Sequence, residues 1–129
     1  MKLLLDTVAF LDAALLPAKD IPKRARELLL DPDNDLYVSI ASYWEISIKY
    51  SIGKLSLPEA PERLLPTHRE KIGAELLAID EESTFHLTRL PPVHNDPFDR
   101  LLICQAIVHG MVLLTPDARI SRYPVRTAW

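Results

Sequence analysis

The segment Lys2-Leu3-Leu4-Leu5-Asp6-Thr7 decides how the rest of this chain is interpreted. A short apolar run that ends in polar residues predicts a buried strand. Thr7 is placed to cap a helix over residues 7–15, and Pro17 lies just beyond its expected end. The same alternation of short apolar runs and longer amphipathic stretches continues along the chain. This pattern predicts an α/β fold with a central, mostly parallel sheet.

The remaining elements follow from periodicity and from turn residues. Trp44, Ile48 and Ile52 recur at a spacing of four and are expected to form one apolar stripe of a helix, with the aromatic side chain in the core. Gly53 and Gly110 are expected to end helices. We predict strands at residues 2–5, 36–40, 76–79, 111–114 and, at an edge, 125–129, and helices at residues 7–15, 21–30, 41–52, 62–75, 81–90 and 98–109.

Composition indicates one domain, residues 1–129, in a reducing compartment. The chain has 129 residues, of which 48% are hydrophobic and 26% charged, as in a globular protein. Cys104 is the only cysteine, so it excludes an intramolecular disulfide and is expected to be a packed core thiol. Asp6 interrupts the N-terminal apolar stretch, which excludes a secretion signal, and residues 101–114 are too short to span a bilayer. A cytoplasmic protein is expected.

Charge restricts the classes of ligand. The net charge of −3 gives no global basic field for nucleic acid, so a phosphate-bearing substrate would need a metal ion and a local basic patch. The sequence has no glycine-rich phosphate loop and no serine or cysteine nucleophile motif. Candidates for such a basic patch, each of which is otherwise a solvated surface charge, are Lys49, Lys54, Arg100 and Arg119.

Four separated carboxylates carry the chemical information: Asp6, Glu45, Asp99 and Asp117. Each lies where an apolar run meets a turn or a helix start. In a parallel α/β sheet these points share one edge, the edge at which such sheets bind ligands. Four acids gathered there would repel one another unless a cation lay among them. Oxygen ligands select Mg²⁺ or Mn²⁺ rather than zinc, which prefers His and Cys.

Each acid also has a purely structural interpretation. Asp6 is able to cap the first helix, and Glu45 is the last residue of a capping box, Ser-x-x-Glu, that begins at Ser42. Asp117 is able to serve as a first-turn acid next to the short turn at residues 118–121.

The segment around Asp96 needs a separate assignment, because it holds two acids at one helix start. We assign the capping role to Asp96 and the ligand role to Asp99, although Asp96 is close enough to reach a metal ion through water. His94 either assists the chemistry or forms hydrogen bonds within its loop.

The motifs as an ordered set resemble the PIN-domain ribonucleases, and more narrowly the VapC-type toxins of bacterial toxin–antitoxin pairs. The resemblance covers nearly the whole chain. It is carried by Leu4-Leu5-Asp6-Thr7, Ser42-Tyr43-Trp44-Glu45-Ile46-Ser47-Ile48-Lys49, Gly53-Lys54-Leu55, His94-Asn95-Asp96-Pro97-Phe98-Asp99-Arg100-Leu101-Leu102, Leu114-Thr115-Pro116-Asp117 and Tyr123-Pro124-Val125-Arg126-Thr127-Ala128-Trp129.

The resemblance implies a three-layer α/β/α fold and an Mg²⁺- or Mn²⁺-dependent endoribonuclease. By motif match, the metal-binding and catalytic acids fall on Asp6, Glu45, Asp99 and Asp117, and Thr115 matches a polar position of the same site. The resemblance also implies a homodimer, a cognate antitoxin, an RNA substrate and operator DNA bound only through the antitoxin. Two alternatives stay open: an inactive PIN-like module that binds RNA or protein, and a metal-dependent DNA nuclease.

Overall fold

A five-stranded parallel sheet forms the centre of the molecule. The computed structural model describes residues 1–129. Every strand pair is parallel, so the prediction of a mostly parallel sheet is confirmed and extended to the whole sheet. The strands, in spatial order, are β3 (Glu75–Leu77), β2 (Asp35–Ser39), β1 (Lys2–Leu5), β4 (Val112–Leu114) and β5 (Thr127–Ala128).

The helices agree with the sequence prediction in number and order, but three of them are shorter. Pro22 is the N-cap of the second helix rather than part of its first turn. The fourth helix ends at Lys71 because Gly73, with φ of 73°, turns the backbone into the left-handed region. The helices are α1 (Thr7–Leu15), α2 (Lys23–Leu30), α3 (Ile40–Ser51), α4 (Pro61–Lys71), α5 (Glu81–His86) and α6 (Pro97–His109), with 3₁₀ turns at η1 (Ala18–Asp20), η2 (Leu87–Arg89) and η3 (Ala118–Arg122).

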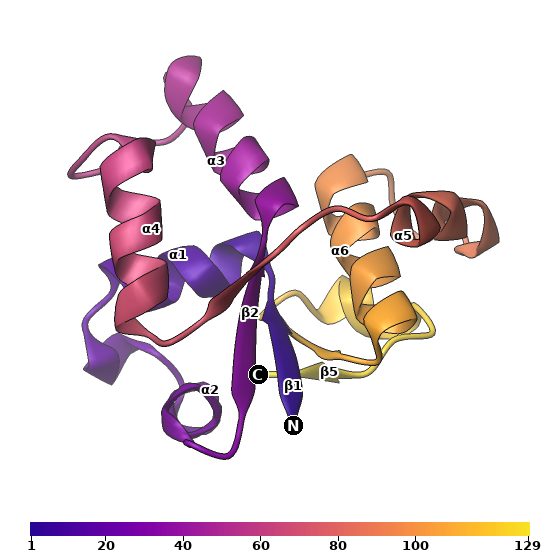
Figure 1. Ribbon diagram of the computed structural model, residues 1–129, viewed down its shortest axis with the longest axis horizontal. Helices are drawn as coiled ribbons and strands as arrows, with labels where there is room; N and C mark the ends of the chain where they lie inside the picture. The colour runs from indigo at the N-terminus through magenta and orange to yellow at the C-terminus, as the bar shows by residue number, and fades with distance from the viewer.

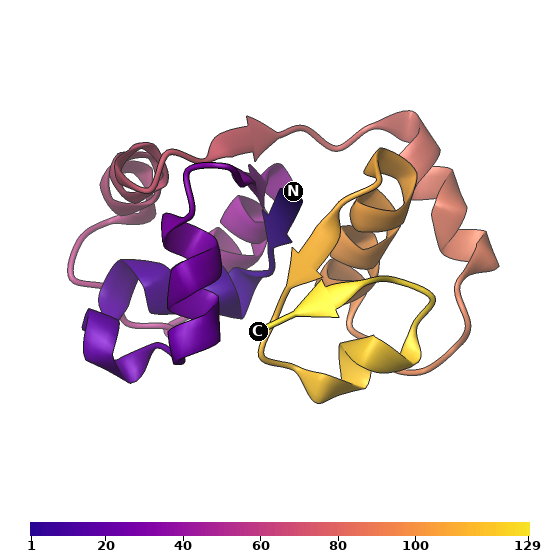
Figure 2. The ribbon, with the colours of Figure 1, turned by 90° about the horizontal axis from the view of Figure 1, so that it is seen from below.

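The sheet separates two hydrophobic cores, which confirms a three-layer arrangement (Figures 1 and 2). Successive residues of β1 point to opposite faces: Leu3 and Leu5 pack in one core, and Leu4 packs in the other. The first core includes Phe10 of α1 and Leu65 of α4, and the second includes Leu102 of α6 and Ile120 of η3. A strand that is buried on both faces has apolar residues at successive positions. This continuous apolar run is the reason that β1 could be predicted from the sequence.

The orientation of α3 corrects one prediction. Trp44 and Ile52 do not face the core, because their exposed fractions are 64% and 58%. The buried residues of α3 are Ala41, Ser42, Glu45 and Ile46, so the helix turns a mostly small and polar stripe inward. The thiol of Cys104, in contrast, is buried and unpaired as predicted.

The strand order places the end of β1 at a point where the direction of the sheet connections changes. β1 lies between β2 and β4, and the backbone N–H of Asp6 donates to the carbonyl of Leu114 at 3.0 Å. The carboxyl ends of β1 and β4 are therefore held side by side. Crevices of this kind are the usual ligand sites of open parallel sheets.

No helix combines the length and the apolar character needed to cross a membrane.

Candidate active site

Asp6 is a buried carboxylate that also caps α1. Its Oδ1 accepts from the backbone N–H of Ala9 at 2.7 Å, and its Oδ2 accepts from the hydroxyl of Thr115. The residue is 3% exposed. Burial raises the pKa of Asp6 to about 6, against the lowering effect of those two hydrogen bonds, and the negative charges of Asp99 and Asp117 raise it further. The capping interpretation is therefore correct for Asp6, and each oxygen keeps a second lone pair for another partner.

Glu45 does not belong to a capping box. The helix begins earlier than that interpretation requires, because Ser39 is the N-cap and its Oγ accepts from the N–H of Ala41 at 3.0 Å. Glu45 therefore lies more than one turn inside α3. Its Oε2 accepts from Nζ of Lys49 at 2.6 Å, whereas Oε1 is buried and has no hydrogen-bond partner. A buried carboxylate oxygen without a donor is costly unless a cation or water satisfies it.

Asp96 caps the start of α6, as the sequence predicts, and leaves the Asp99 side chain free of that role. Oδ1 of Asp96 accepts from the N–H of Phe98 at 2.9 Å and from that of Asp99 at 3.1 Å. The Asp99 side chain takes no part in capping, and its Oδ2 lies 3.1 Å from Nε2 of His94. Burial raises the pKa of Asp99, and the charges of Asp96 and Glu45 raise it further, while the hydrogen bond to His94 lowers it.

Thr115 connects two of the acids. Its hydroxyl donates to Asp6 and accepts from the backbone N–H of Asp117 at 3.0 Å. Asp117 caps η3 through the N–H of Arg119 at 2.9 Å, and the Arg119 guanidinium pairs with its carboxylate at 2.8 Å. Hydrogen bonds from that guanidinium hold the pKa of Asp117 below its ordinary value. Asp117, like Glu45 with Lys49, thus already has a counter-charge from the protein itself.

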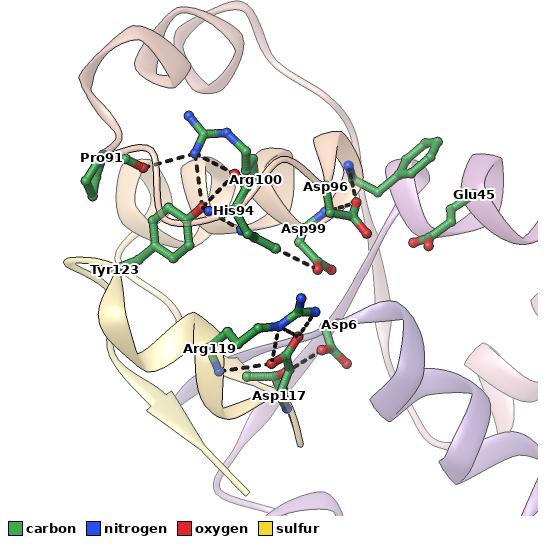
Figure 3. Close-up of polar contacts among 12 residues, drawn as sticks. Asp6, Glu45, Pro91, His94, Asp96, Asp99, Arg100, Asp117, Arg119 and Tyr123 are labelled. Carbon is green, nitrogen blue, oxygen red and sulfur yellow. Dashed lines mark hydrogen bonds and ion pairs between the residues drawn. The ribbon is translucent and has the colours of Figure 1, made fainter.

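The predicted acids come from separate elements and face a shared region at the end of the sheet (Figure 3). Asp6 follows β1, Glu45 lies in α3, Asp99 opens α6 and Asp117 follows β4. Their charges act on one another: Asp99 and Asp117 raise the pKa of Asp6, and Glu45 raises that of Asp99. No three side chains of the ligating types are already arranged as a metal cage.

The residues present nevertheless fit a hard divalent cation. The donors at this edge are carboxylate oxygens, the ligand type that Mg²⁺ and Mn²⁺ prefer. The unpartnered Oε1 of Glu45 supplies a ligand with no competing donor. Burial opposes the ionised forms of Asp6 and Asp99, and a positive ion nearby would relieve that opposition. Their role as metal ligands remains a proposal.

Only part of the predicted basic patch is free for a substrate. Lys54 is exposed, whereas Lys49 is paired with Glu45 and Arg119 with Asp117. Arg100 turns inward, because its Nη1 donates to the carbonyl of Pro91 at 3.0 Å and to that of His94 at 3.3 Å. Arg100 is therefore not a freely solvated surface charge, whereas its contact with phosphate stays a prediction.

Two residues of the site region were not singled out from the sequence. Tyr123 places its hydroxyl 2.6 Å from Nδ1 of His94, and Gln105 accepts from the hydroxyl of Ser39 at 2.6 Å beneath the start of α3. The signal for Gln105 is a lone amide within the apolar run of α6, since a fully buried amide needs partners. Tyr123 carries no local signal, because its partners lie 23 and 29 residues away.

Comparison with known proteins agrees with this architecture. Solved structures of similar fold include VapBC2 from Rickettsia felis bound to a promoter DNA fragment, with a TM-score of 0.74 and 20% identity over 99% of this chain and 98% of that one. DNA-bound VapBC from Salmonella typhimurium has a TM-score of 0.66 and 24% identity over 99% and 97% of the two chains. At these identities the likeness concerns the fold alone.

Sequence relationships identify the family. Ribonuclease VapC16 of Mycobacterium tuberculosis is 35% identical over 69 residues, which are 54% of this chain and 49% of that protein. The chain thus spans about half the length of the curated relative it matches. The sequence identity indicates that the chain is homologous to VapC ribonucleases. The PIN domain model matches residues 3–126. The chain therefore belongs to the PIN domain family, as its ordered motifs predict.

Proposed function

We propose that this protein is an Mg²⁺- or Mn²⁺-dependent endoribonuclease and the toxin of a toxin–antitoxin pair. The single observation that carries the proposal is that the buried carboxylates at this edge of the sheet lack enough hydrogen-bond donors and positive charge to stabilise their ionised forms. Glu45 keeps one buried oxygen without any donor, while burial and neighbouring charges oppose ionisation of Asp6 and Asp99. A protein that used these acids only to cap helices would have no reason to bury Glu45 inside α3.

Asp6, Glu45 and Asp99 would hold the ion, and Asp117 would complete the site or orient a bound water. When bound, the divalent ion supplies an acidified water as nucleophile and stabilises charge on the phosphate. The chain does the positioning. Thr115 and the N–H of Ala9 fix both oxygens of Asp6.

The substrate would be an RNA phosphodiester. Attack by a water molecule does not use the neighbouring 2′-hydroxyl. With the 3′-oxygen as the leaving group, the P–O3′ bond breaks and the products carry a 5′-phosphate and a 3′-hydroxyl. Exposed Lys54 and the outer guanidinium atoms of Arg119 are the proposed contacts to backbone phosphates. Lys49 is half exposed at the rim, where release from Glu45 on ion binding would free its ammonium group.

The direct test is cleavage of an end-labelled RNA oligonucleotide, with a DNA oligonucleotide of the same sequence beside it. We expect cleavage of RNA with Mn²⁺ or Mg²⁺, none with EDTA, and 5′-phosphate ends. Asp6→Asn and Glu45→Gln should abolish most activity. Asp80→Asn is the matched control, because Asp80 also caps a helix, α5, but lies outside the candidate site. Unchanged cleavage by Asp6→Asn would refute the assignment, and cleavage of DNA alone would indicate the DNA nuclease.

A catalytically inactive PIN-like binding module is the second candidate. The observation in its favour is that Asp6 and Asp117 do cap helices and that Asp117 is neutralised by Arg119. Thermal unfolding followed during Mn²⁺ titration separates the two. An ion that binds only the folded state raises stability by about 2.7 kcal/mol at a hundredfold excess over Kd. A capping-only protein would show no saturable shift.

The partners proposed for the toxin are a second copy of the chain and a cognate antitoxin, with operator DNA bound through the antitoxin. Support comes from homology to a VapC ribonuclease and from similar solved structures described as VapBC assemblies. A short neighbouring gene encoding a DNA-binding fold with a disordered tail is expected. Co-expression of that gene product should yield a complex in which the RNA cleavage is inhibited.

A further inference from the structure

Tyr123 lies at the centre of a buried hydrogen-bond cluster next to Asp99. Its hydroxyl oxygen is 3.0 Å from Nη1 of Arg100, 3.1 Å from the backbone N of His94 and 2.6 Å from Nδ1 of the same histidine. The carbonyl of His94 is farther away, at 3.4 Å. Tyr123 is 3% exposed, and the His94 side chain is 10% exposed, so water does not complete these contacts.

The hydrogen-bond capacity of the hydroxyl determines the direction of its bond to His94. A phenolic oxygen has one proton and accepts two hydrogen bonds. The guanidinium of Arg100 and the backbone N–H of His94 are able only to donate, so together they occupy both acceptor positions. The remaining contact, to Nδ1, must be one in which Tyr123 donates and Nδ1 accepts.

The tautomer of His94 follows from this direction. In a neutral imidazole one nitrogen accepts and the other carries the proton. With Nδ1 accepting from Tyr123, the proton is on Nε2, which lies 3.1 Å from Oδ2 of Asp99. His94 therefore donates to Asp99. The other oxygen, Oδ1, accepts no hydrogen bond from the protein, so one carboxylate oxygen is fixed and the other is available.

We propose that Tyr123 and His94 are positioning residues for Asp99: Tyr123 fixes the tautomer of His94, and His94 holds Oδ2 so that Oδ1 is presented to a divalent cation. Figure 3 shows this relay from Tyr123 through His94 to Asp99, on the side of the carboxylate facing away from Glu45. The proposal rests on the proposed function, because it assigns Asp99 a cation to bind. It extends the site to a residue after η3, the last helical segment of the chain.

The first experiment measures the tautomer directly in the metal-free protein. The ¹⁵N chemical shifts and couplings of the imidazole nitrogens distinguish Nε2–H from Nδ1–H. The spectrum of His94→Gln identifies the His94 signals by their absence. We expect the Nε2–H form in the wild-type protein and loss of that preference in Tyr123→Phe. A wild-type ring protonated on Nδ1 alone would overturn the proposal.

The second experiment measures Mn²⁺ affinity by calorimetry in the same variants. Outer-shell partners of metal ligands typically change affinity or activity by about 10- to 100-fold. We expect Tyr123→Phe and His94→Leu to weaken Mn²⁺ binding about tenfold. His94→Gln should bind within about threefold of wild type, because its amide is able to donate to Asp99 as Nε2 does. Asp80→Asn should bind as wild type.

The outcomes separate this proposal from the proposed function. Equal Mn²⁺ affinity in wild type, Tyr123→Phe and His94→Leu would overturn the positioning role while leaving the nuclease intact. Equal weakening in His94→Gln and His94→Leu would also overturn it, because it would mean that the packing of the ring matters and its proton does not. Failure of the wild-type protein to bind Mn²⁺ would overturn the proposed function and the positioning role together.

Discussion

The hydroxyl of Thr115 donates to the carboxylate of Asp6 across 109 residues of sequence. The contact exists because β1 and β4 are neighbours in the sheet, which brings their carboxyl ends together. It provides one of the two hydrogen bonds that oppose the effect of burial on Asp6. The electrostatic balance of the candidate site therefore depends on the pairing of two strands from opposite ends of the chain.

Asp6→Asn should stabilise the metal-free protein near neutral pH. The pKa of Asp6 is about 6 in the folded protein and 3.8 without perturbation, so the native state holds the proton more tightly between these values. Stability should fall as pH rises through that window, by about 3 kcal/mol in total. Removing the charge should recover about 1–3 kcal/mol near pH 7 and nothing below about pH 4. Urea unfolding at both pH values measures this.

Asp80→Asn provides the opposite control for that experiment. Hydrogen bonds from Ser83 and His109 hold the pKa of Asp80 below its ordinary value, so its ionised form stabilises the folded protein. This stability is present at neutral pH and is lost as pH falls. The variant should be destabilised near neutral pH and not in acid. If both variants shifted stability in the same direction at neutral pH, the electrostatic account of Asp6 would be wrong.

Thr115→Val should destabilise the protein most where Asp6 is ionised. Valine keeps the shape of threonine but removes the donor to Asp6 and the acceptor for the N–H of Asp117. Hydrogen bonds to charged groups contribute about 1.5–3 kcal/mol. We expect a loss of about 2 kcal/mol near pH 7 and a smaller loss near pH 4. Thr115→Ser, which keeps the hydroxyl, should lose much less, and a loss independent of pH would contradict the role assigned to Thr115.

Lys49→Met should destabilise the metal-free protein and strengthen its binding of Mn²⁺. Nζ of Lys49 is the donor to Oε2 of Glu45, so its loss leaves a buried carboxylate without its counter-charge. Because Lys49 is half exposed, we expect a cost of about 1 kcal/mol, less than for a fully buried pair. A cation at Glu45 would no longer be repelled by the ammonium, so affinity should rise about three- to tenfold.

Calorimetric titration of Lys49→Met with Mn²⁺ tests this prediction, with Lys54→Met as the control. Lys54 lies in the turn that follows α3 and is exposed, so its replacement should change neither stability nor affinity. Weaker Mn²⁺ binding by Lys49→Met would mean that the ammonium supports the site rather than competing with an ion for Glu45.

Gln105→Leu should destabilise the fold through the start of α3. The amide is fully buried, accepts from Ser39 at 2.6 Å and donates to the carbonyl of Ala78 at 3.1 Å. Its loss leaves the proton of the buried Ser39 hydroxyl without an acceptor and removes the donor to the Ala78 carbonyl, which together cost about 1–3 kcal/mol. A double-mutant cycle with Ser39→Ala measures the coupling. Additive effects of the two substitutions would show that the hydrogen bond contributes nothing to stability.

A local feature can be predicted from the sequence when all the residues that determine it lie within one short segment. The run Leu3-Leu4-Leu5 predicts a buried strand, and the prediction is correct because both faces of β1 pack against hydrophobic cores. Asp96 is predicted as a cap from the local sequence because its partners, the backbone N–H groups of Phe98 and Asp99, lie only two and three residues further along the chain. The predicted helix ends at Gly53 and Gly110 follow from positive φ values, which glycine adopts without strain.

The sequence by itself determined the alternation of strands and helices, the family and the set of acids, because each is encoded by local periodicity or motif order. Only the tertiary structure decided which face of α3 is buried, that Arg100 turns inward and that Tyr123 reaches His94. The physical reason is that these outcomes depend on hydrogen bonds and packing between segments that meet only after the sheet has formed. The local sequence around Glu45 predicted a capping box that begins at Ser42. In the folded protein α3 begins earlier, at Ile40, so the Glu45 carboxylate lies more than one turn inside the helix.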